Sequence, residues 1–442
     1  VKKLVKQVIT AKLKLHLSSE QKKLLREVSL AYRDALNDSS EIAFTNGKVS
    51  SANKLQKLVY QDIRTKFGLP SQMSCNVPRQ VAATYKGLWT KVKQNANHIQ
   101  LGQTKKRYKG LDKPPKYASR TCNLNYKRDY SFVKQGVSLI TLQGRIKVFY
   151  SGYNKHVELI KSGEDAVKFG GAKIYYARSN KTYYLLVSLE LKIPDIEPDA
   201  INCVVGVDVG QRYHAVTTDT ANQAHFYPGK QCNHKATRYQ KVRKSLQQKG
   251  TRSAKKRLVS LSGKERRFIA DRNHCLSKQI ATPNTLIGLE NLTNIRERTQ
   301  PRKIGKKAST KQRKANHKQA KWSFAELHLF IDYKSVLNNS LAIKVDADYT
   351  SQACPHCGHT SRGNRPNKGL IFHCESCGFE LHADLIGARN IAMRALLFRQ
   401  DWESTGLLSA APDGSSAEAK AARLSRFAEM RWTAESSQHH NL

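Results

Sequence analysis

The sequence predicts a multi-domain α/β protein, in which a β-rich N-terminal part with a helical insertion precedes a second α/β domain. Three observations support this: the hydrophobic period changes along the chain, a segment with two prolines separates two regions, and strands alternate with helices beyond it. At 442 residues the chain is long enough for two to three domains with a substantial core. No repeat of about 20–50 residues is visible, which argues against a solenoid.

The N-terminal part begins with a strand and continues with helices. Residues 8–17 alternate between apolar and polar, which is the period of a half-buried strand. Ser18 and Gln21 then match a capping box at the start of a helix. Apolar residues recur at helical spacing across 24–36, 51–66 and 78–98. From 121 to 193 the period returns to two, with a hairpin at Ser179–Asn180, so this stretch predicts a small β-barrel.

The second domain follows the linker IPDIEPDA. Three short strands come first (VVGVDVG, YHAVTTDT and QAHFYPG), followed by a long basic helical stretch through about 281 and the strand LIGLE. The helix WSFAELHLFIDYKSVL, the strand LAIKVD and the helix ADLIGARNIAMRALL complete the series. This order is typical of an RNase H-like fold. The tail from about 403 loses the basic bias and is expected to be disordered or loosely helical.

The charge of the chain indicates a polyanionic partner. Lys and Arg outnumber Asp and Glu by 77 to 34, which gives a formal net charge of +43 and a pI near 10.0. A membrane surface is also anionic, but the sequence has no run of about 18 apolar residues and no signal peptide, so nucleic acid is favoured. The chain begins with Val, which indicates an alternative start or missing first residues.

Four of the nine cysteines predict a zinc site. Cys354, Cys357, Cys374 and Cys377 form the pattern C-x2-C-x16-C-x2-C, which can present four thiolates tetrahedrally. Gly358 and Gly378 stand where the two knuckle turns require a positive φ. Four cysteine ligands make a closed, structural site for one Zn²⁺; redox dithiols or free core cysteines are the alternative. The remaining cysteines are scattered, which fits a reducing cytosol and thus a cytoplasmic protein.

Three carboxylates remote in sequence are candidates for a magnesium site. Asp208 lies in an apolar strand, Glu290 ends another, and Asp384 stands where the last helix of the domain begins. A buried lone carboxylate costs several kcal/mol unless it is paired or bound to metal. Two divalent cations held about 3.5–4 Å apart by such ligands can hydrolyse a phosphodiester. The alternative for Asp384 is a helix cap. The nearby acids Asp219, Asp346 and Asp348 are assigned to turns.

Two basic segments flank the strand that carries Glu290. They span residues 235–267 and 296–321, and each contains one acidic residue. Such a run is often a solvated face, but its position beside the candidate site favours phosphate binding. The candidates for this contact are Lys255, Lys256, Arg257, Lys306 and Lys307.

Taken together, the motifs resemble TnpB, the transposon-encoded RNA-guided nuclease, and the compact type V CRISPR effectors. The resemblance is densest from about 203 to 395, in GVDVG, GLENLTNIRER, WSFAELHLFIDYKSVL, DADYTSQACPHCGHTSRGNR and FHCESCGFELHADLIGARNIA. It implies a RuvC-like nuclease in which Asp208, Glu290 and Asp384 bind two Mg²⁺ ions. Arg365 of GNR and Arg389 of ARN match family positions, and the resemblance implies that they meet either the nucleic acid or the active-site phosphate. Asp348 departs from the family, which more often has an uncharged residue there.

The resemblance also implies a domain layout. A wedge-type β-barrel covers 1–18 and 110–198, and a helical recognition insertion covers 19–109. The RuvC-like nuclease covers 199–353, a zinc ribbon 354–378, the final nuclease helix 379–402 and the tail 403–442. The N-terminal lobe would hold a guide RNA, as a monomer or a dimer on the RNA, and would read a short motif beside a double-stranded DNA target.

The function expected on this basis is RNA-guided DNA cleavage. Three alternatives remain open at this point. The first is an RNA-guided DNA-binding protein without cleavage, against which the presence of all three carboxylates argues. The second is a guide-independent transposase or resolvase-like nuclease, because the same fold hosts those activities. The third is a simple zinc-ribbon nucleic-acid binder, which would need zinc but no magnesium.

Overall fold

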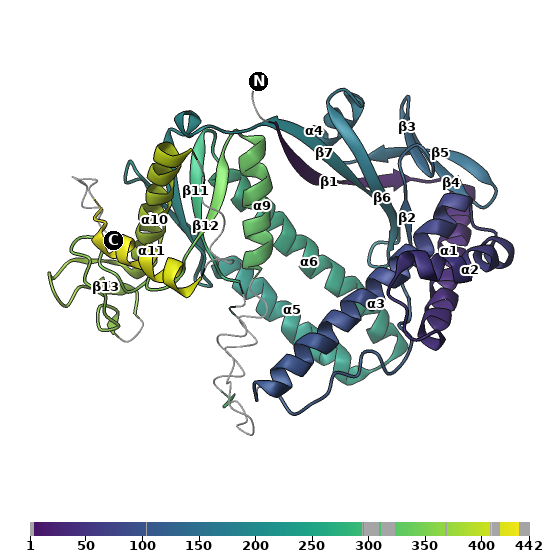
Figure 1. The fold of residues 1–442 in the computed structure, drawn as a ribbon, viewed down its shortest axis with the longest axis horizontal. Coiled ribbons are helices and arrows are strands. Elements are labelled where there is room, and N and C mark those ends of the chain that lie inside the picture. Colours follow the sequence, from purple (N-terminus) through teal and green to yellow (C-terminus); the bar gives the residue numbers. More distant parts are fainter. Residues whose placement is uncertain are drawn as a thin grey trace. The chain divides into compact units, whose positions relative to one another are not determined.

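The computed structural model describes residues 4–102, 104–293, 295, 309–310, 323–366, 369–406, 408 and 416–432. The described residues separate into two compact units, one from Leu4 to Ile193 and the other from Pro194 onward. Figure 1 shows the elements of both units. In the part of the chain that is described, no helix is both long and apolar enough to cross a membrane.

The first unit is built on a seven-stranded sheet with the strand order β2-β6-β7-β1-β5-β4-β3. Its strands are β1 (Leu4–His16), β2 (Thr121–Leu124), β3 (Tyr130–Val133), β4 (Gly136–Thr141), β5 (Gly144–Ser151), β6 (Val167–Ala177) and β7 (Thr182–Pro194). The edge strands β2 and β3 follow each other in the chain. The Tyr130 hydroxyl of β3 donates a hydrogen bond to the Gly170 carbonyl of β6 at 2.7 Å, and the Phe132 and Phe169 rings meet at 5.0 Å. The sheet is therefore nearly closed.

Helices interrupt this sheet between its first and second strands. They are α1 (Ser19–Thr45), α2 (Ala52–Phe67) and α3 (Ser71–Gln100), and a short helix α4 (Asn154–Lys161) follows β5. The predicted capping box at the start of α1 is confirmed, because the Ser18 hydroxyl accepts from Gln21 N and the Gln21 side chain accepts from Ser18 N, both at 3.1 Å. The apolar positions of α1, among them Leu25 and Tyr32, are fully buried.

The second unit contains a five-stranded sheet with the strand order β10-β9-β8-β11-β12. Its strands are β8 (Cys203–Asp208), β9 (Tyr213–Asp219), β10 (Ala224–Pro228), β11 (Thr285–Glu290) and β12 (Leu341–Val345), and a 3-10 turn (Pro198–Ala200) precedes them. β8 pairs with β9, and β9 with β10, in antiparallel fashion, whereas β8, β11 and β12 are parallel. The predicted order of strands and helices is the observed order.

Helices cover both faces of this sheet. They are α6 (Arg252–Ile280), α9 (Phe324–Leu337) and α10 (Ala383–Thr405), whereas α5 (Lys230–Lys249) packs against α6. One core cluster joins Val207 and Ile287 of the sheet to Leu276 of α6 and Ile331 of α9. On the other face Ala395 of α10 packs in a second cluster with sheet residues. Figure 1 shows α9 and α10 on either side of β11 and β12.

Two expectations differ from the structure. The single basic helix predicted to run to about 281 is divided, because Gly250 takes the left-handed conformation (φ 63°) after α5 and Thr251 caps α6 by accepting from Ala254 N. The tail, expected to be disordered or loosely helical, contains the helix α11 (Ala417–Glu429). Its Phe427 is buried in a core cluster with α10, so part of the tail is docked.

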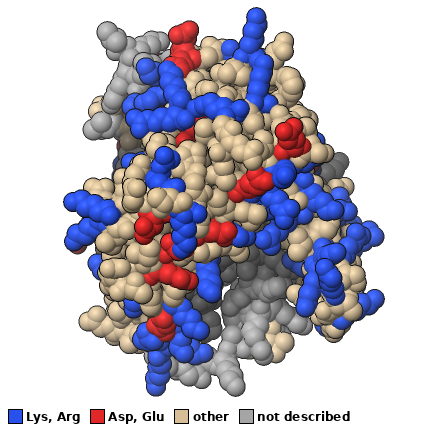
Figure 2. All heavy atoms as spheres, turned by 90° about the vertical axis from the view of Figure 1, so that its right-hand side faces the viewer, with Lys and Arg blue, Asp and Glu red and all other residues tan. Residues whose placement is uncertain are grey.

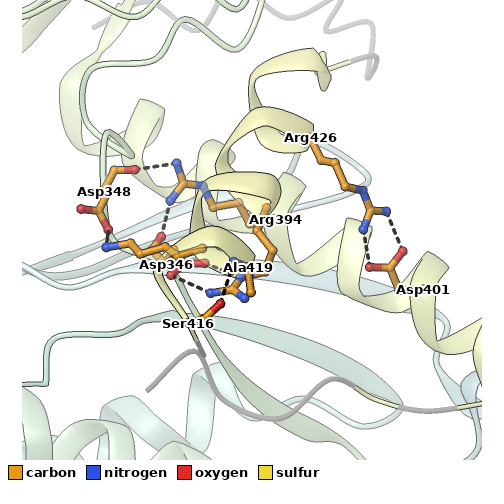
Figure 3. A network of polar contacts seen from close by, with 9 residues as sticks. Asp346, Asp348, Arg394, Asp401, Ser416, Ala419 and Arg426 are labelled. Atoms are coloured by element: carbon orange, nitrogen blue, oxygen red, sulfur yellow. Dashed lines mark hydrogen bonds and ion pairs between the residues drawn. The ribbon is translucent and has the colours of Figure 1, made fainter. Parts of the chain in front are cut away.

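Polar contacts also fix α11 (Figure 3). Arg423 forms an ion pair of 2.9 Å with the buried Asp346, and Arg426 forms one of 2.6 Å with Asp401 of α10. The Arg394 side chain of α10 donates to the backbone carbonyls of Asp346 and Asp348. These contacts tie the segment after β12 to α10 and α11.

Candidate active site and metal centre

Asp208 and Glu290 stand side by side because of the register of two parallel strands. Val207 of β8 is the register partner of Leu289 of β11, and Asp208 and Glu290 are the next residues. Carboxyl ends of parallel strands meet at one edge of a sheet, which is where α/β proteins commonly place their ligands. Thr350 lies beside them and donates its hydroxyl to Oε1 of Glu290 at 2.6 Å.

Helix α10 brings Asp384 to the same edge, and two glycines allow it. A Cβ at Gly206 of β8 would overlap the Ala388 carbonyl of α10, so only glycine lets the helix lie directly on the strand. A Cβ at Gly387 would lie 3.0 Å from Oδ2 of Asp208. Asp384 precedes Gly387 by three residues, which places both on one face of the helix. The first turn of α10 therefore lies over the Asp208 carboxylate.

The three carboxylates influence one another's charge. Burial raises the pKa of Asp208 well above its ordinary value, and the negative charges of Glu290 and Asp384 raise it further. Burial also raises the pKa of Glu290, against the opposing effect of the Thr350 hydrogen bond. Arg365 contributes a cation, 3.5 Å from Oδ1 of Asp384. The arrangement is an acidic cluster with excess negative charge, which a divalent cation would offset.

The carboxylates are nevertheless less tightly grouped than the cysteines. Groups of three or more His, Cys, Asp or Glu side chains can hold a metal ion. Among the described residues, the four cysteines are the one such group whose ligand atoms all lie within 4.8 Å of one another. Of the acids assigned to turns, Asp219 accepts from Gln223 N at 2.7 Å, and Asp346 and Asp348 pair with Arg423 and Lys420.

The cysteine cluster has the dimensions of a tetrahedral zinc site. The Sγ atoms of Cys354 and Cys377 lie 3.8 Å apart and those of Cys357 and Cys374 lie 3.5 Å apart. Zn–S bonds of about 2.3 Å in a tetrahedron separate sulfur atoms by about 3.8 Å. Burial acts to raise the pKa of Cys374, but backbone N–H groups and neighbouring thiols outweigh it and lower the pKa to about 6, which favours a thiolate ligand.

The segment around the four cysteines fits a zinc ribbon that packs against α10, the helix that carries Asp384. Gly358 (φ 82°) and Gly378 (φ 71°) have the positive φ expected of the two knuckle turns. The short strands β13 (Ile371–His373) and β14 (Glu380–His382) pair in antiparallel fashion and lead directly into α10. Phe372 is fully buried in a cluster with Ala383 of α10. The histidines at 356, 359, 373 and 382 are outside the metal-ligating group.

The predicted nucleic-acid contacts have different surroundings. Lys255, Lys256 and Arg257 are exposed on α6, whereas Lys306 and Lys307 lie outside the described residues. Arg365 is half-buried beside Asp384. Arg389 is 8% exposed, and it donates to Oδ1 of Asn222 at 2.7 Å and lies over the Trp432 ring. Arg389 thus has internal partners, and its contact with nucleic acid stays a prediction.

Sequence reasoning missed the residues that hold the carboxylates in place. Thr350 orients Glu290, and the Asn390 amide donates to the carbonyls of Thr350 and Ala353 at 2.7 and 2.8 Å. Glycines inside the strands VVGVD and LIGLE were a readable signal, because glycine in a strand interior marks a close approach of another backbone. Thr350 and Asn390 carried no such signal, since their roles depend on tertiary contacts.

Comparison with known proteins shows which family this region is similar to. The family model described as "Cas12f1-like, TNB domain" matches residues 324–391, which include the four cysteines and Asp384. The CRISPR-associated endodeoxyribonuclease Cas12f1 of Sulfoacidibacillus thermotolerans is 37% identical over 107 residues, 24% of this chain and 21% of that protein. The resemblance to the TnpB family and its compact CRISPR relatives is confirmed.

Other relatives match over different lengths. Cas12f2 of Micrarchaeota archaeon (strain CG1_02_47_40) is 29% identical over 48% of this chain and 40% of its own length. InsQ of Escherichia coli (strain K12), provisionally named an RNA-guided DNA endonuclease, is 36% identical over 15% of this chain and 16% of its own. The chain therefore spans two fifths or less of the length of these relatives.

A solved structure of a Cas12f1-sgRNA-target DNA complex is similar at a lower level. It is 14% identical with a TM-score of 0.43, and the likeness covers 88% of this chain and 99% of that one. A TM-score of this size does not establish a common fold of the whole chain.

Proposed function

We propose that the chain is an RNA-guided DNA endonuclease with one Mg²⁺-dependent site at Asp208, Glu290 and Asp384. The observation that carries the proposal is the meeting of the ends of β8 and β11 under the first turn of α10. On this proposal residues 199–353 and 379–402 form an RNase H-like (RuvC) nuclease, and 354–378 form its zinc ribbon. Residues 1–18 and 110–198 form the wedge domain around a recognition insertion at 19–109.

The donor set fits Mg²⁺. All three side chains offer oxygen, the ligand that this hard cation prefers. Burial and the negative charges of Glu290 and Asp384 raise the pKa of Asp208 despite the opposing effect of Arg365, and a bound cation would relieve this repulsion. When bound, two such ions activate water and stabilise the leaving oxygen in phosphodiester hydrolysis. Thr350 orients Glu290, and Gly387 leaves space beside Asp208 for the carboxylate to turn toward a cation.

The cysteine cluster would hold one structural Zn²⁺. Its four sulfur ligands leave no open coordination position, so its role is to order the ribbon and not to hydrolyse a bond. Strand β14 ends two residues before Asp384, and Phe372 of β13 packs against Ala383 at the start of α10. A zinc ion at this place would therefore fix the start of the helix that carries the third carboxylate.

The partners proposed are a guide RNA and double-stranded DNA. The net charge of +43 suits a polyanion, and relatives named above are endodeoxyribonucleases associated with CRISPR. Base pairing between the guide and one DNA strand would supply sequence specificity, while the protein contacts the backbones and a short adjacent motif. Such a protein would work in the cytoplasm.

Substitution of Asp208 tests the catalytic assignment. The chain is purified with the RNA that accompanies it, that RNA is sequenced, and a plasmid with the matching target is offered. We expect Asp208→Ala to abolish Mg²⁺-dependent cleavage while RNA and target binding persist. Asp219→Ala is the matched control, since it removes a carboxylate from a turn of the same domain. Continued Mg²⁺-dependent cutting by Asp208→Ala refutes the assignment.

The dependence on RNA separates this function from a guide-independent nuclease. A transposase or resolvase of the same fold needs no guide, so ribonuclease treatment would leave its activity intact. We expect the treatment to abolish cleavage and re-addition of the sequenced RNA to restore it. Cleavage that survives complete RNA removal would establish the guide-independent alternative.

A further inference from the structure

Two neighbouring cavities in the first unit have walls rich in cations. The first, of about 420 Å³, is lined by Arg26, Leu30, Arg33, Arg120, Tyr176, Arg178 and Lys181. The second, of about 460 Å³, is lined by Lys14, Leu15, His16, Leu17, Lys22, Lys181, Thr182 and Tyr183. Lys181 belongs to both walls. We call the two together the cationic groove; it is formed by β1, α1, Arg120 before β2, and the β6–β7 hairpin.

The groove carries a net positive charge. Seven of its lining residues are Lys or Arg, and no carboxylate lines either cavity in the described part of the chain. Of these cations, Arg33 forms an ion pair of 2.6 Å with Asp34, which is not among the lining residues. Figure 2 shows that Lys and Arg cover broad parts of the face that it displays, with acidic side chains scattered among them. Concave positive surfaces concentrate field lines and attract anions.

The first cavity also contains a planar stacking surface. The guanidinium of Arg120 lies over the Tyr176 ring at 3.9 Å from its centroid. Arg178 donates from Nη2 to the Ala118 carbonyl at 3.2 Å, which holds its guanidinium near the same wall. A guanidinium fixed on an aromatic ring presents its other face as a platform on which an unstacked nucleobase can lie. The wall therefore combines phosphate-binding cations with a surface for a base.

We propose that the cationic groove binds an unpaired segment of RNA, with one nucleotide extruded onto the Arg120 platform. The proposal rests on the proposed function only in taking RNA as the partner. Cavities of this volume lie within the range of about 300–1,000 Å³ of small-ligand sites, which suits a single nucleotide. Duplex DNA keeps its bases stacked inside, whereas folded RNA offers splayed bases in loops and bulges. The seven cations along the groove would attract the phosphates on either side of that nucleotide.

The test measures RNA binding without cleavage. The chain is stripped of RNA at high salt and titrated in Mg²⁺-free buffer with a labelled hairpin RNA bearing an unpaired loop. We expect Arg120→Gln/Arg178→Gln to weaken this binding about tenfold or more, and the slope of log K against log salt to become shallower by about 1.4, or about 0.7 for each lost contact to a single strand. Arg120→Lys keeps the charge and should retain the slope while losing the preference for the unpaired loop.

A charge-matched variant controls for general attraction. Lys57→Gln/Arg79→Gln removes two exposed cations of the same unit outside the groove and should leave the affinity unchanged. The proposal is overturned if both double variants lose affinity equally, if a fully paired hairpin suffers the same loss, or if single-stranded DNA and not RNA responds. Because the assay does not measure cleavage, a chain without nuclease activity would still give the expected result. The proposal on RNA binding and the proposal on DNA cleavage can therefore fail independently.

Discussion

Gly387 and Asp208 are packed so closely that a single methyl group between them would disturb the candidate site. A Cβ at position 387 would lie 3.0 Å from Oδ2 and 3.1 Å from Cγ of the Asp208 carboxyl group. Such contacts are tighter than ordinary van der Waals distances, so the carboxylate would have to move. Position 387 is helical, where alanine is intrinsically favoured over glycine by about 1 kcal/mol. Replacing Gly387 with alanine should therefore disturb the candidate site without lowering the stability of the protein.

We expect Gly387→Ala to lower the rate of DNA cleavage by about tenfold to a hundredfold, because a displaced ligand misaligns the reacting groups. The melting temperature should stay the same or rise. Gly87→Ala in α3 is the control, since a Cβ there meets nothing within 4 Å. Cleavage assays and thermal melts on both variants check this. Full activity in Gly387→Ala would show that the Asp208 carboxylate is not held where the reaction needs it.

Removing one charge from the carboxylate cluster should stabilise the metal-free protein. Glu290 and Asp384 repel the buried Asp208, so Asp208→Asn keeps the side-chain shape and removes the repulsion. In Mg²⁺-free buffer the variant should melt higher, by about 2–4 °C for each kcal/mol relieved. Mg²⁺ should raise the melting temperature of the unaltered chain and not that of the variant. Asp219→Asn is the control; a variant that melts lower without Mg²⁺ contradicts the expectation.

Loss of a cysteine ligand should remove the metal and loosen the ribbon. We expect about one zinc per purified chain by elemental analysis, and much less in Cys374→Ser. Backbone amides of residues 354–382 should then exchange hydrogen faster, and cleavage should fall because Asp384 follows this segment. Cys275→Ser removes an exposed cysteine on α6 and should change neither quantity. A zinc content that is equal in the two variants would rule out a role for Cys374 as a ligand.

The sequence predicted those parts of the fold and the candidate site that depend on local pattern. Alternating residues located the strands, and the spacing of the cysteines grouped them before any contact was known. Asp208 was placed in one apolar strand and Glu290 at the end of another, and the parallel pairing of β8 and β11 sets them side by side. What could not be predicted depends on contacts between distant segments, such as the hydrogen bond from Thr350 to Glu290.

The two differences from the structure are the divided basic helix and the docked helix of the tail. In both, the overall composition of the segment drew attention away from the residues that mark a helix end. The basic character of residues 230–280 suggested one helix, although Gly250 and Thr251 carry the residues of a helix end and a helix cap. The composition of the tail suggested a disordered or loosely helical segment, although Ser416 caps α11 by accepting from Ala419 N. The docking of that helix depends on Asp346 and Asp401, whose partners no local pattern identifies.

Two arginines of α11 offer a matched pair for measuring how this helix is held. Arg423 is 17% exposed and pairs with Asp346, which is 4% exposed, whereas Arg426 and Asp401 are 48% and 32% exposed. Removing one partner of a buried pair leaves an uncompensated charge and costs about 3–5 kcal/mol, whereas an exposed pair contributes about 1 kcal/mol or less. The two substitutions should therefore differ sharply in stability (Figure 3).

We expect Arg423→Ala to lower the free energy of unfolding by about 3 kcal/mol and Arg426→Ala by less than about 1 kcal/mol. Because Asp346 follows β12 and Arg394 binds the carbonyls of Asp346 and Asp348, the first variant should also increase hydrogen exchange in residues 346–350. That segment includes Thr350, which orients Glu290, so cleavage should fall with it. Denaturant titration and hydrogen exchange measure both effects. Equal losses in the two variants would mean that α11 is held by its apolar face around Phe427 and not by the buried ion pair.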